Sequence, residues 1–174
     1  MGEVDTSYIK YLVGLSKSGR KNSFMELCKL NVDAIYTLVL RTIADLKLSE
    51  EVTIDVFIAA WENLNHYRED VAFSDWLKGI TVFTIMEEVR TNERRKKLQK
   101  QTKLSKNAKI PEAISLNKLE RMVFELEEMQ RLVFVLHDME GYSYPEITDF
   151  LGERSEKKVK EILKVTRREL MVRI

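Results

Sequence analysis

The sequence predicts an all-α protein with two small helical domains joined by a basic linker, the C-terminal domain containing a helix-turn-helix. Three observations lead to this prediction. Apolar residues recur at three- and four-residue spacing along most of the 174 residues, and no segment alternates as a strand would. The periodicity stops in a lysine-rich segment at residues 99–112. A short helix, a glycine turn and a basic helix then follow near the C-terminus.

Composition narrows the class of protein. The chain is 44% hydrophobic and 33% charged, which suits a globular protein. It has neither a signal peptide nor a run of about 18 apolar residues, so we expect a cytoplasmic protein without membrane insertion. The single cysteine, Cys28, excludes an internal disulfide or a cysteine metal site. Because Cys28 continues the apolar pattern of Phe24 and Leu27, we expect it in the core rather than as a nucleophile.

The formal net charge of +1 conceals alternating blocks of charge. Residues 1–89 carry a net charge of −5, and residues 90–109 carry +8. Residues 110–151 carry −6, and residues 152–174 carry +4. Two acidic blocks, each followed by a basic block, suggest two modules that each offer one surface to a polyanion and another to a basic protein.

Three helices are expected in the first 64 residues. The first covers residues 5–17 and is broken by glycine, and the second covers residues 22–44. Residues 45–48 would connect it to a third helix that Ser49 caps. The expected core positions of the second helix are Phe24, Leu27, Cys28, Val32, Ile35, Tyr36, Val39 and Ile43. Those of the third are Val52, Val56, Ala59, Ala60 and Leu64, with Trp61 as a large anchor.

A fourth helix is expected from near Ser74 to about Leu98, after a polar loop at residues 65–70. Its apolar start contains Phe73, Trp76, Leu77 and Ile80. Its end is a basic run over residues 90–97. Cations suit a solvated helix C-terminus, but five of them within eight residues, followed by a basic linker, favour phosphate contact. The linker itself could be a tether without a partner.

The C-terminal segment combines several helix signals. Helical patterns at residues 114–126 and 129–137 precede it. Ser143 can cap a short helix, with Glu146 completing a capping box and Pro145 in the first turn. Gly152 is a left-handed helix stop, and Ser155 can cap the next helix.

The last helix has two different faces when residues are placed 100° apart. One face is apolar and comprises Val159, Ile162, Leu163, Thr166 and Leu170. The opposite face holds Lys157, Glu161, Lys164 and Arg168, flanked by Lys158, Lys160 and Arg154. A packed face and a cationic face favour a helix that enters the major groove of DNA; the alternative is a basic helix on the surface of an ordinary bundle.

Three segments together resemble a known family. They are residues 49–64, residues 73–90 and residues 129–147, which include Phe73-Ser74-Asp75-Trp76 and Glu140-Gly141-Tyr142-Ser143. In order and spacing they resemble the second and fourth conserved regions of bacterial extracytoplasmic-function sigma factors, the smallest sigma subunits of RNA polymerase. The resemblance covers nearly the whole chain.

The resemblance implies a domain plan and partners. Residues 1–98 would form a region 2-like domain that binds core RNA polymerase and the downstream promoter element, and residues 99–113 would be a linker. Residues 114–174 would form a region 4-like domain that reads the upstream element. The implied function is an alternative sigma factor that directs promoter recognition and transcription initiation, with core polymerase, promoter DNA and an anti-sigma factor as partners and no cofactor.

Candidate site residues follow from the charge pattern and the resemblance. For the upstream element they are Arg154, Ser155, Lys157, Lys158, Lys160, Glu161, Lys164 and Arg168. For the downstream element they are His66, Tyr67, Arg68, Lys78, Arg90, Arg94 and Arg95. His66 and Tyr67 fit ordinary loop residues, and the alternative is that an aromatic ring there stacks on an unstacked base. For core polymerase they are Glu51, Asp55, Ile58 and Glu62. No catalytic or metal site is expected, because the two histidines lie in different domains and no phosphate loop or nucleophile motif is present.

The fourth helix departs from the family pattern. Where the family carries arginine and asparagine, this sequence has Gly79, Val82, Phe83 and Met86, with Arg90 the only polar member. An exposed apolar stripe usually marks a contact. The stripe could meet an inhibitor protein, the C-terminal domain in a closed form, or unstacked bases. An alternative function is therefore a sigma-like interaction protein with weakened promoter melting.

Overall fold

The computed structural model describes residues 6–98 and 117–173, and the side chains of residues 6–92 and 117–173. Within these residues every regular element is a helix, which confirms the all-α class. The N-terminal unit consists of α1 (Thr6–Lys17), α2 (Lys21–Ile43), α3 (Leu46–Asn63), a short η1 (Leu64–His66) and α4 (Phe73–Leu98). The C-terminal unit consists of α5 (Lys118–Phe124), α6 (Glu128–Phe134), η2 (Val135–Met139), α7 (Tyr144–Leu151) and α8 (Glu156–Arg173).

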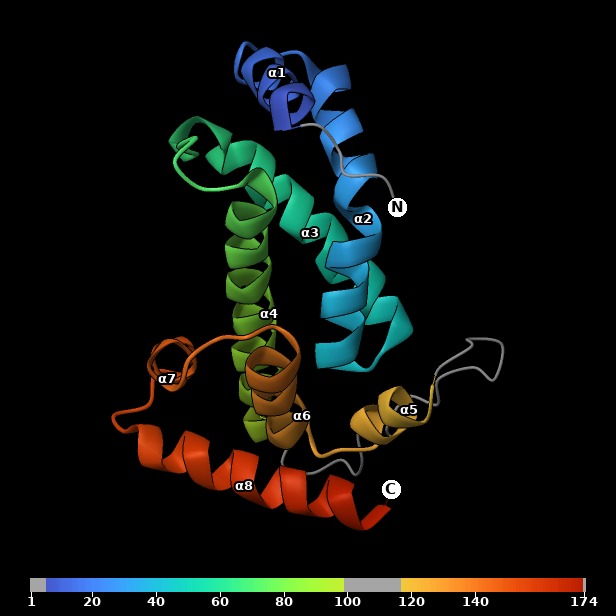
Figure 1. The fold of residues 1–174 in the computed structure, drawn as a ribbon, viewed down its shortest axis with the longest axis vertical. Helices are drawn as coiled ribbons and strands as arrows, with labels where there is room; N and C mark the ends of the chain where they lie inside the picture. The colour runs from blue at the N-terminus through green and yellow to red at the C-terminus, as the bar shows by residue number, and fades with distance from the viewer. Residues whose placement is uncertain (1–5, 99–116, 174) are drawn as a thin grey trace.

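The N-terminal unit is a bundle of three long helices. Helices α2, α3 and α4 pack against one another, and α1 packs against the first half of α2 (Figure 1). Leu27, Val56, Ala60 and Leu77 are fully buried in its core, as their three- and four-residue spacing predicts. Trp61 of α3 closes one side of this core by an edge-to-face contact with Phe24, with ring centroids 5.0 Å apart.

The start of α3 differs from the prediction. The helix begins at Leu46 because Asp45 caps it, with the Leu48 N–H donating to Asp45 Oδ1 over 2.9 Å. Ala44 takes the left-handed conformation at φ 56°, which ends α2 and turns the chain directly into this cap. The prediction that Ser49 is the cap is therefore wrong. Ser49 lies one turn inside α3 and is fully buried.

The second half of α2 is buried on more sides than the sequence predicts. Leu38, Val39 and Leu40 are consecutive and all buried, whereas Val32, an expected core position, is 38% exposed. Three consecutive buried positions cannot lie on one face of a helix. They are buried because α3 and α4 cover one side of α2, and the C-terminal unit covers another.

The caps expected in the C-terminal unit are confirmed. Ser143 and Glu146 form a reciprocal capping box on α7, and Pro145 lies in the first turn. Gly152 ends α7 at φ 65°, a conformation that glycine adopts without strain. The Lys157 N–H then donates to Ser155 Oγ over 3.2 Å at the start of α8. The buried residues of α8 are those expected of its packed face: Val159, Leu163, Thr166 and Leu170.

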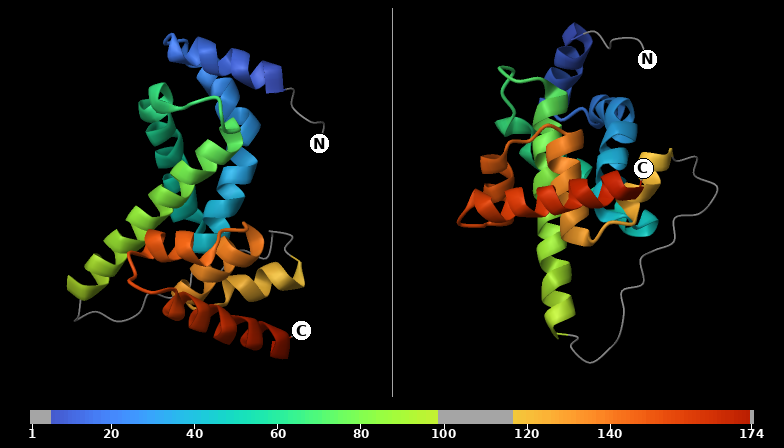
Figure 2. Two further views of the ribbon diagram at one scale, coloured as in Figure 1. Left: turned by 60° about the vertical axis from the view of Figure 1, so that its left-hand side comes forward. Right: turned by 60° about the horizontal axis from the view of Figure 1, so that its bottom comes forward.

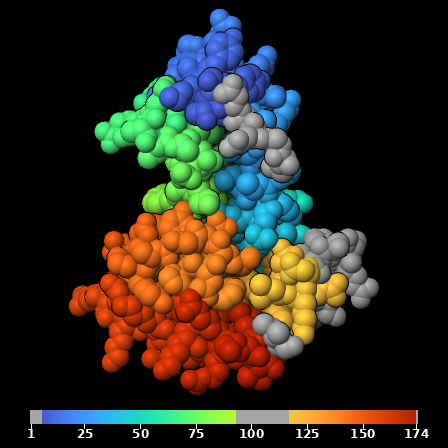
Figure 3. All heavy atoms as spheres, in the orientation of Figure 1, coloured from blue at the N-terminus to red at the C-terminus, as the bar shows by residue number. Residues whose placement is uncertain are grey.

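The two units pack directly on each other. Helix α6 lies against α2, α7 contacts α4, and α8 runs across the far side of α6 (Figures 1 and 2). The space-filling view shows the C-terminal unit seated beneath the N-terminal one without a gap on this face (Figure 3). One apolar cluster includes buried residues from both units. The boundaries of the two predicted domains stay a prediction, and the predicted linker at 99–113 lies outside the described residues.

None of the helices in the described ranges is both long and apolar enough to cross a lipid bilayer.

Cys28 allows a first prediction. Its side chain packs against the core, and burial raises the pKa of its thiol to about 11. At pH 8 only ~0.1% of such a thiol is ionised, against roughly a quarter of an unperturbed cysteine. We expect iodoacetamide to alkylate native Cys28 about 100-fold more slowly than the denatured chain, measured by intact mass against time. Equal rates would contradict the burial of Cys28.

Candidate nucleic-acid interface

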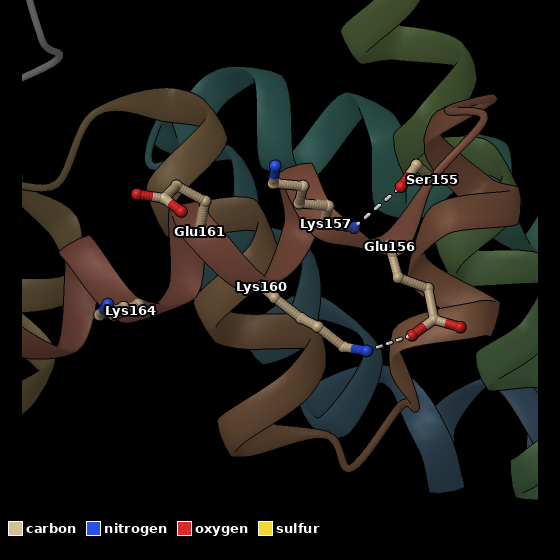
Figure 4. Close-up of a pocket in the computed structure, with 6 residues that line it drawn as sticks. All are labelled: Ser155, Glu156, Lys157, Lys160, Glu161 and Lys164. Atoms are coloured by element: carbon tan, nitrogen blue, oxygen red, sulfur yellow. Dashed lines mark hydrogen bonds and ion pairs between the residues drawn. The ribbon is translucent and has the colours of Figure 1, made fainter.

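The outer face of α8 presents the residues predicted for the upstream element. All of Arg154, Ser155, Lys157, Lys158, Lys160, Glu161, Lys164 and Arg168 are exposed. A shallow open groove runs along this face and is lined by Ser155, Glu156, Lys157, Lys160, Glu161 and Lys164 (Figure 4). In this view the side chains of Lys157 and Glu161 extend to one side of α8, and those of Glu156 and Lys160 extend to the other.

The cations of α8 fall into two classes. Lys160 pairs with Glu156 at 2.6 Å, and Lys158 pairs with Glu153. Among the described residues, Lys157, Lys164 and Arg168 have no ion-pair partner and remain available to an anion. These three are members of the stripe that the helical projection predicts.

Arg167 of α8 and Tyr144 of α7 take part in contacts that join α8 to the neighbouring helices. The helical pattern of the sequence singled out neither residue. Arg167 Nε donates to Asp138 Oδ2 over 2.9 Å, and its second nitrogen pairs with the same carboxylate. This hydrogen bonding raises the pKa of Arg167. The Lys160 ammonium lies 5.1 Å from the centroid of the Tyr144 ring, which stacks on His137. Such pairs fix the angle of α8 on η2 and α7, and sequence spacing carries no signal for them.

The predicted polymerase surface on α3 is one continuous face. Glu51, Asp55, Ile58 and Glu62 are all exposed, since spacings of four, three and four residues return to the same side of a helix. Ile58 is 51% exposed, and Ile54, one turn before it, is 60% exposed. The face is therefore an apolar strip bordered by carboxylates. Ile54 was missed, although an isoleucine on the polar side of an amphipathic helix was a usable signal.

The side chain of Tyr67 is buried and packs against its neighbours. It is only 5% exposed, and its hydroxyl donates to the Val71 carbonyl over 2.8 Å. Its ring makes an edge-to-face contact with Phe73, and Lys17 Nζ donates to its backbone carbonyl over 2.7 Å. Burial also raises the pKa of the Tyr67 hydroxyl. An unstacked base could reach this ring only after the loop moved, whereas His66 and Arg68 beside it are exposed.

The remaining downstream candidates do not form one free patch. Lys78 pairs with Glu140 of the C-terminal unit at 2.9 Å. Arg90 pairs with Glu87 at 2.6 Å and also donates to the Phe150 carbonyl of α7 over 2.9 Å. The side chains of Arg94 and Arg95 lie outside the described residues.

The apolar stripe of α4 is divided by the fold. Val82 and Met86 are buried, whereas Gly79 is exposed and Phe83 is 64% exposed. The expectation of one exposed stripe is wrong, because α4 is covered on more than one side: α2 and α3 pack against it, and α7 also contacts it.

Comparisons with known proteins agree with this architecture. Residues 27–95, which span most of α2 to α4, match the family model for sigma-70 region 2. No curated protein sequence matches the chain significantly. The structure is similar to that of the sigma factor RpoE from Bartonella quintana, solved in complex with the anti-sigma factor NepR, at 17% identity and a TM-score of 0.60. This match covers 84% of the present chain and 93% of that chain.

A second similar structure is CnrH, solved in complex with the cytosolic domain of CnrY, at 22% identity and a TM-score of 0.53. It covers 97% of the present chain and 96% of that one. The family model assigns the region 2 sequence, and the two solved structures extend the shared fold to the C-terminal unit. Residues 27–95 of this chain thus match sigma-70 region 2, and the chain as a whole shares its fold with these two solved structures, the first of which is that of a sigma factor.

Proposed function

We propose that this protein is an alternative sigma factor that binds core RNA polymerase and directs it to promoters. The observation that carries the proposal is the region 2 match over residues 27–95, which contains the exposed acidic and apolar face of α3. The protein acts by binding and not as an enzyme. Because the similar RpoE structure was solved in complex with an anti-sigma factor, and CnrH was solved in complex with a second protein, an anti-sigma factor is proposed as a third partner beside polymerase and DNA.

The partner proposed for each surface follows from the charge of that surface. The carboxylates of α3 meet a basic surface of the polymerase, and Ile54 and Ile58 supply the apolar contact. The free cations of α8 meet the phosphates and base edges of the upstream element. Exposed His66 and Arg68, with Lys78 and Arg90, serve the downstream element in region 2.

Transcription in a purified system tests the function directly. Core polymerase of the source organism, mixed with this protein, is expected to produce run-off transcripts from promoters in that genome, and core polymerase alone is not. Absence of stimulation at every promoter, together with no binding to core polymerase, would overturn the proposal.

The α3 face gives a sharper prediction. Ile58→Ser removes apolar area that polymerase would cover, and we expect the affinity for core polymerase to fall about tenfold, corresponding to ~1.4 kcal/mol. Fluorescence anisotropy of labelled protein titrated with core enzyme measures it. Val172→Ser, at a residue of α8 that is 83% exposed, is the matched control and should leave the affinity unchanged. Equal losses in both variants would remove α3 from the interface.

A second candidate function is a sigma-like regulatory protein that binds polymerase but melts promoters weakly. The burial of Tyr67 favours it, because the one aromatic side chain proposed to hold an unstacked base is occupied by packing. Permanganate footprinting of thymines on polymerase-bound promoter DNA separates the two. Full reactivity in the downstream element would argue for the sigma factor.

A further inference from the structure

We infer that the C-terminal unit acts as an intramolecular competitor for DNA: in the free protein it docks on the N-terminal unit, covers part of α4 and occupies two of the cations proposed to bind the downstream element. The inference rests on the proposed function for the identity of the DNA site. The closed arrangement and its contacts stand independently of that function.

Arg131 of α6 is the centre of the contact between the two units. Its side chain is 6% exposed, and its Nε donates to the Thr42 carbonyl over 2.9 Å. One terminal nitrogen donates to the Ile43 carbonyl over 3.1 Å, and the other donates to Leu126 within its own unit over 2.8 Å. The guanidinium therefore caps the C-terminal end of α2, where free carbonyls and the helix dipole favour a cation.

Two ion pairs flank this buried contact. Arg41 of α2 pairs with Glu120 of α5 at 2.7 Å, and this bonding lowers the pKa of the Glu120 carboxyl. Lys78 of α4 pairs with Glu140, just after η2, at 2.9 Å. The Glu140 side chain is only 13% exposed, so the pair is shielded from water more than an ordinary surface pair. These contacts give the docked arrangement specific polar partners in addition to the shared apolar core.

The docked unit and downstream DNA require the same groups. Lys78 is engaged by Glu140, and Arg90 is bonded to the Phe150 carbonyl of α7. A carboxylate and a helix-end carbonyl, both from the C-terminal unit, thus take the positions that phosphate oxygens would take. Val82 and Met86 of α4 are buried in the apolar cluster that also contains Leu136 and Ile147 from the C-terminal unit. Downstream binding would therefore require the units to separate or shift at this contact.

Zero-length cross-linking tests the docked arrangement. A carbodiimide joins an amine to a carboxylate that lies in ion-pair contact. We expect Lys78 to couple to Glu140 in the free protein, identified by mass spectrometry of the digest. Lys78→Arg keeps the charge but cannot form this amide, and it should remove that cross-link alone. Absence of the Lys78–Glu140 product in the native protein would overturn the inference.

Binding of single-stranded DNA tests the competition. The probe is a fluorescent 20-nucleotide DNA of mixed sequence, titrated at several salt concentrations. Glu140→Gln frees Lys78, and we expect about threefold tighter binding, with a salt slope steeper by about 0.7 for the one additional phosphate contact. Asp149→Asn in α7 changes the charge equally at an exposed site and is the matched control. Asp149→Asn should change the affinity for DNA less than Glu140→Gln does, and its salt slope should equal that of the wild type.

Arg131→Met changes the net charge of the protein in the opposite direction to Glu140→Gln. It removes a cation, which alone would weaken DNA binding, yet opening should free both Lys78 and Arg90. We therefore expect about tenfold tighter binding and a slope steeper by about 1.4. Circular dichroism establishes that the variant is folded, and Glu140→Gln remains decisive if it is not. Unchanged or weaker DNA binding in Glu140→Gln would overturn the inference.

The two proposals fail in different ways. If the protein does not stimulate polymerase but the cross-link and the DNA effects are present, the sigma function fails and the intramolecular contact stands. If polymerase is stimulated but Glu140→Gln binds DNA as the wild type does, the function stands and the competition is rejected.

Discussion

Replacing Arg131 with methionine is expected to lower the free energy of unfolding by about 3 kcal/mol. Methionine preserves most of the side-chain volume, so the loss comes from polar groups rather than from a cavity. The carbonyls of Thr42, Ile43 and Leu126 each lose a hydrogen bond from a charged donor. A buried carbonyl left without a partner costs about 1–3 kcal/mol, and removal of the buried charge offsets part of that cost.

Urea denaturation followed by circular dichroism measures this effect. Arg121→Met is the matched control, because it makes the same substitution at an exposed arginine of α5. The control should change stability by less than about 0.5 kcal/mol. The thermal midpoint of Arg131→Met should fall by roughly 6–12 °C for a chain of this size. Equal effects of the two substitutions would show that the buried contact does not stabilise the fold.

The largest effect on DNA binding is expected from the three unpaired cations of α8. Replacing Lys157, Lys164 and Arg168 together by alanine should weaken binding to an upstream promoter duplex by at least about 100-fold. Each phosphate contact that is lost should lower the salt slope by about 0.9, and a base-reading side chain contributes roughly 1–3 kcal/mol. The single substitutions separate these roles, because a phosphate contact weakens all sequences equally.

Anisotropy titrations with the protein and duplex DNA, with and without core polymerase, measure the change. A triple alanine variant of Lys10, Lys29 and Lys47 is the charge-matched control, since these exposed lysines lie in the N-terminal unit. It should retain upstream binding to within a few-fold. Retained binding by the α8 variant would remove this face from the proposed interface and leave the basic helix as an ordinary surface.

The structure also decides which residues of the apolar stripe predicted on α4 are exposed. Its helical pattern predicted an apolar stripe that could meet an inhibitor, DNA or the C-terminal domain, and the fold places Val82 and Met86 in the interior. Phe83 stays exposed on the same helix. A single exposed aromatic with buried neighbours offers far less apolar area than a continuous stripe, so it does not by itself define a docking surface.

The sequence by itself determined the features that depend on neighbours in the chain. The helices, the capping box of Ser143 and Glu146, the left-handed stop at Gly152 and the packed face of α8 all follow from spacings of three or four residues. The exposed faces of α3 and α8 were predicted for the same reason, because a helix fixes which side chains lie opposite its buried stripe.

Only the tertiary structure decided what depends on contacts between distant segments. Arg131 bonds to carbonyls almost ninety positions away, Lys78 meets Glu140, and Tyr67 turns inward to Phe73. Local periodicity cannot indicate that a cation will cap another helix, or that packing on several sides of α4 will bury Val82 and Met86 of the apolar stripe. The sequence therefore predicted which surfaces the two units could offer, and the packing of one unit on the other determined which of those surfaces remain free.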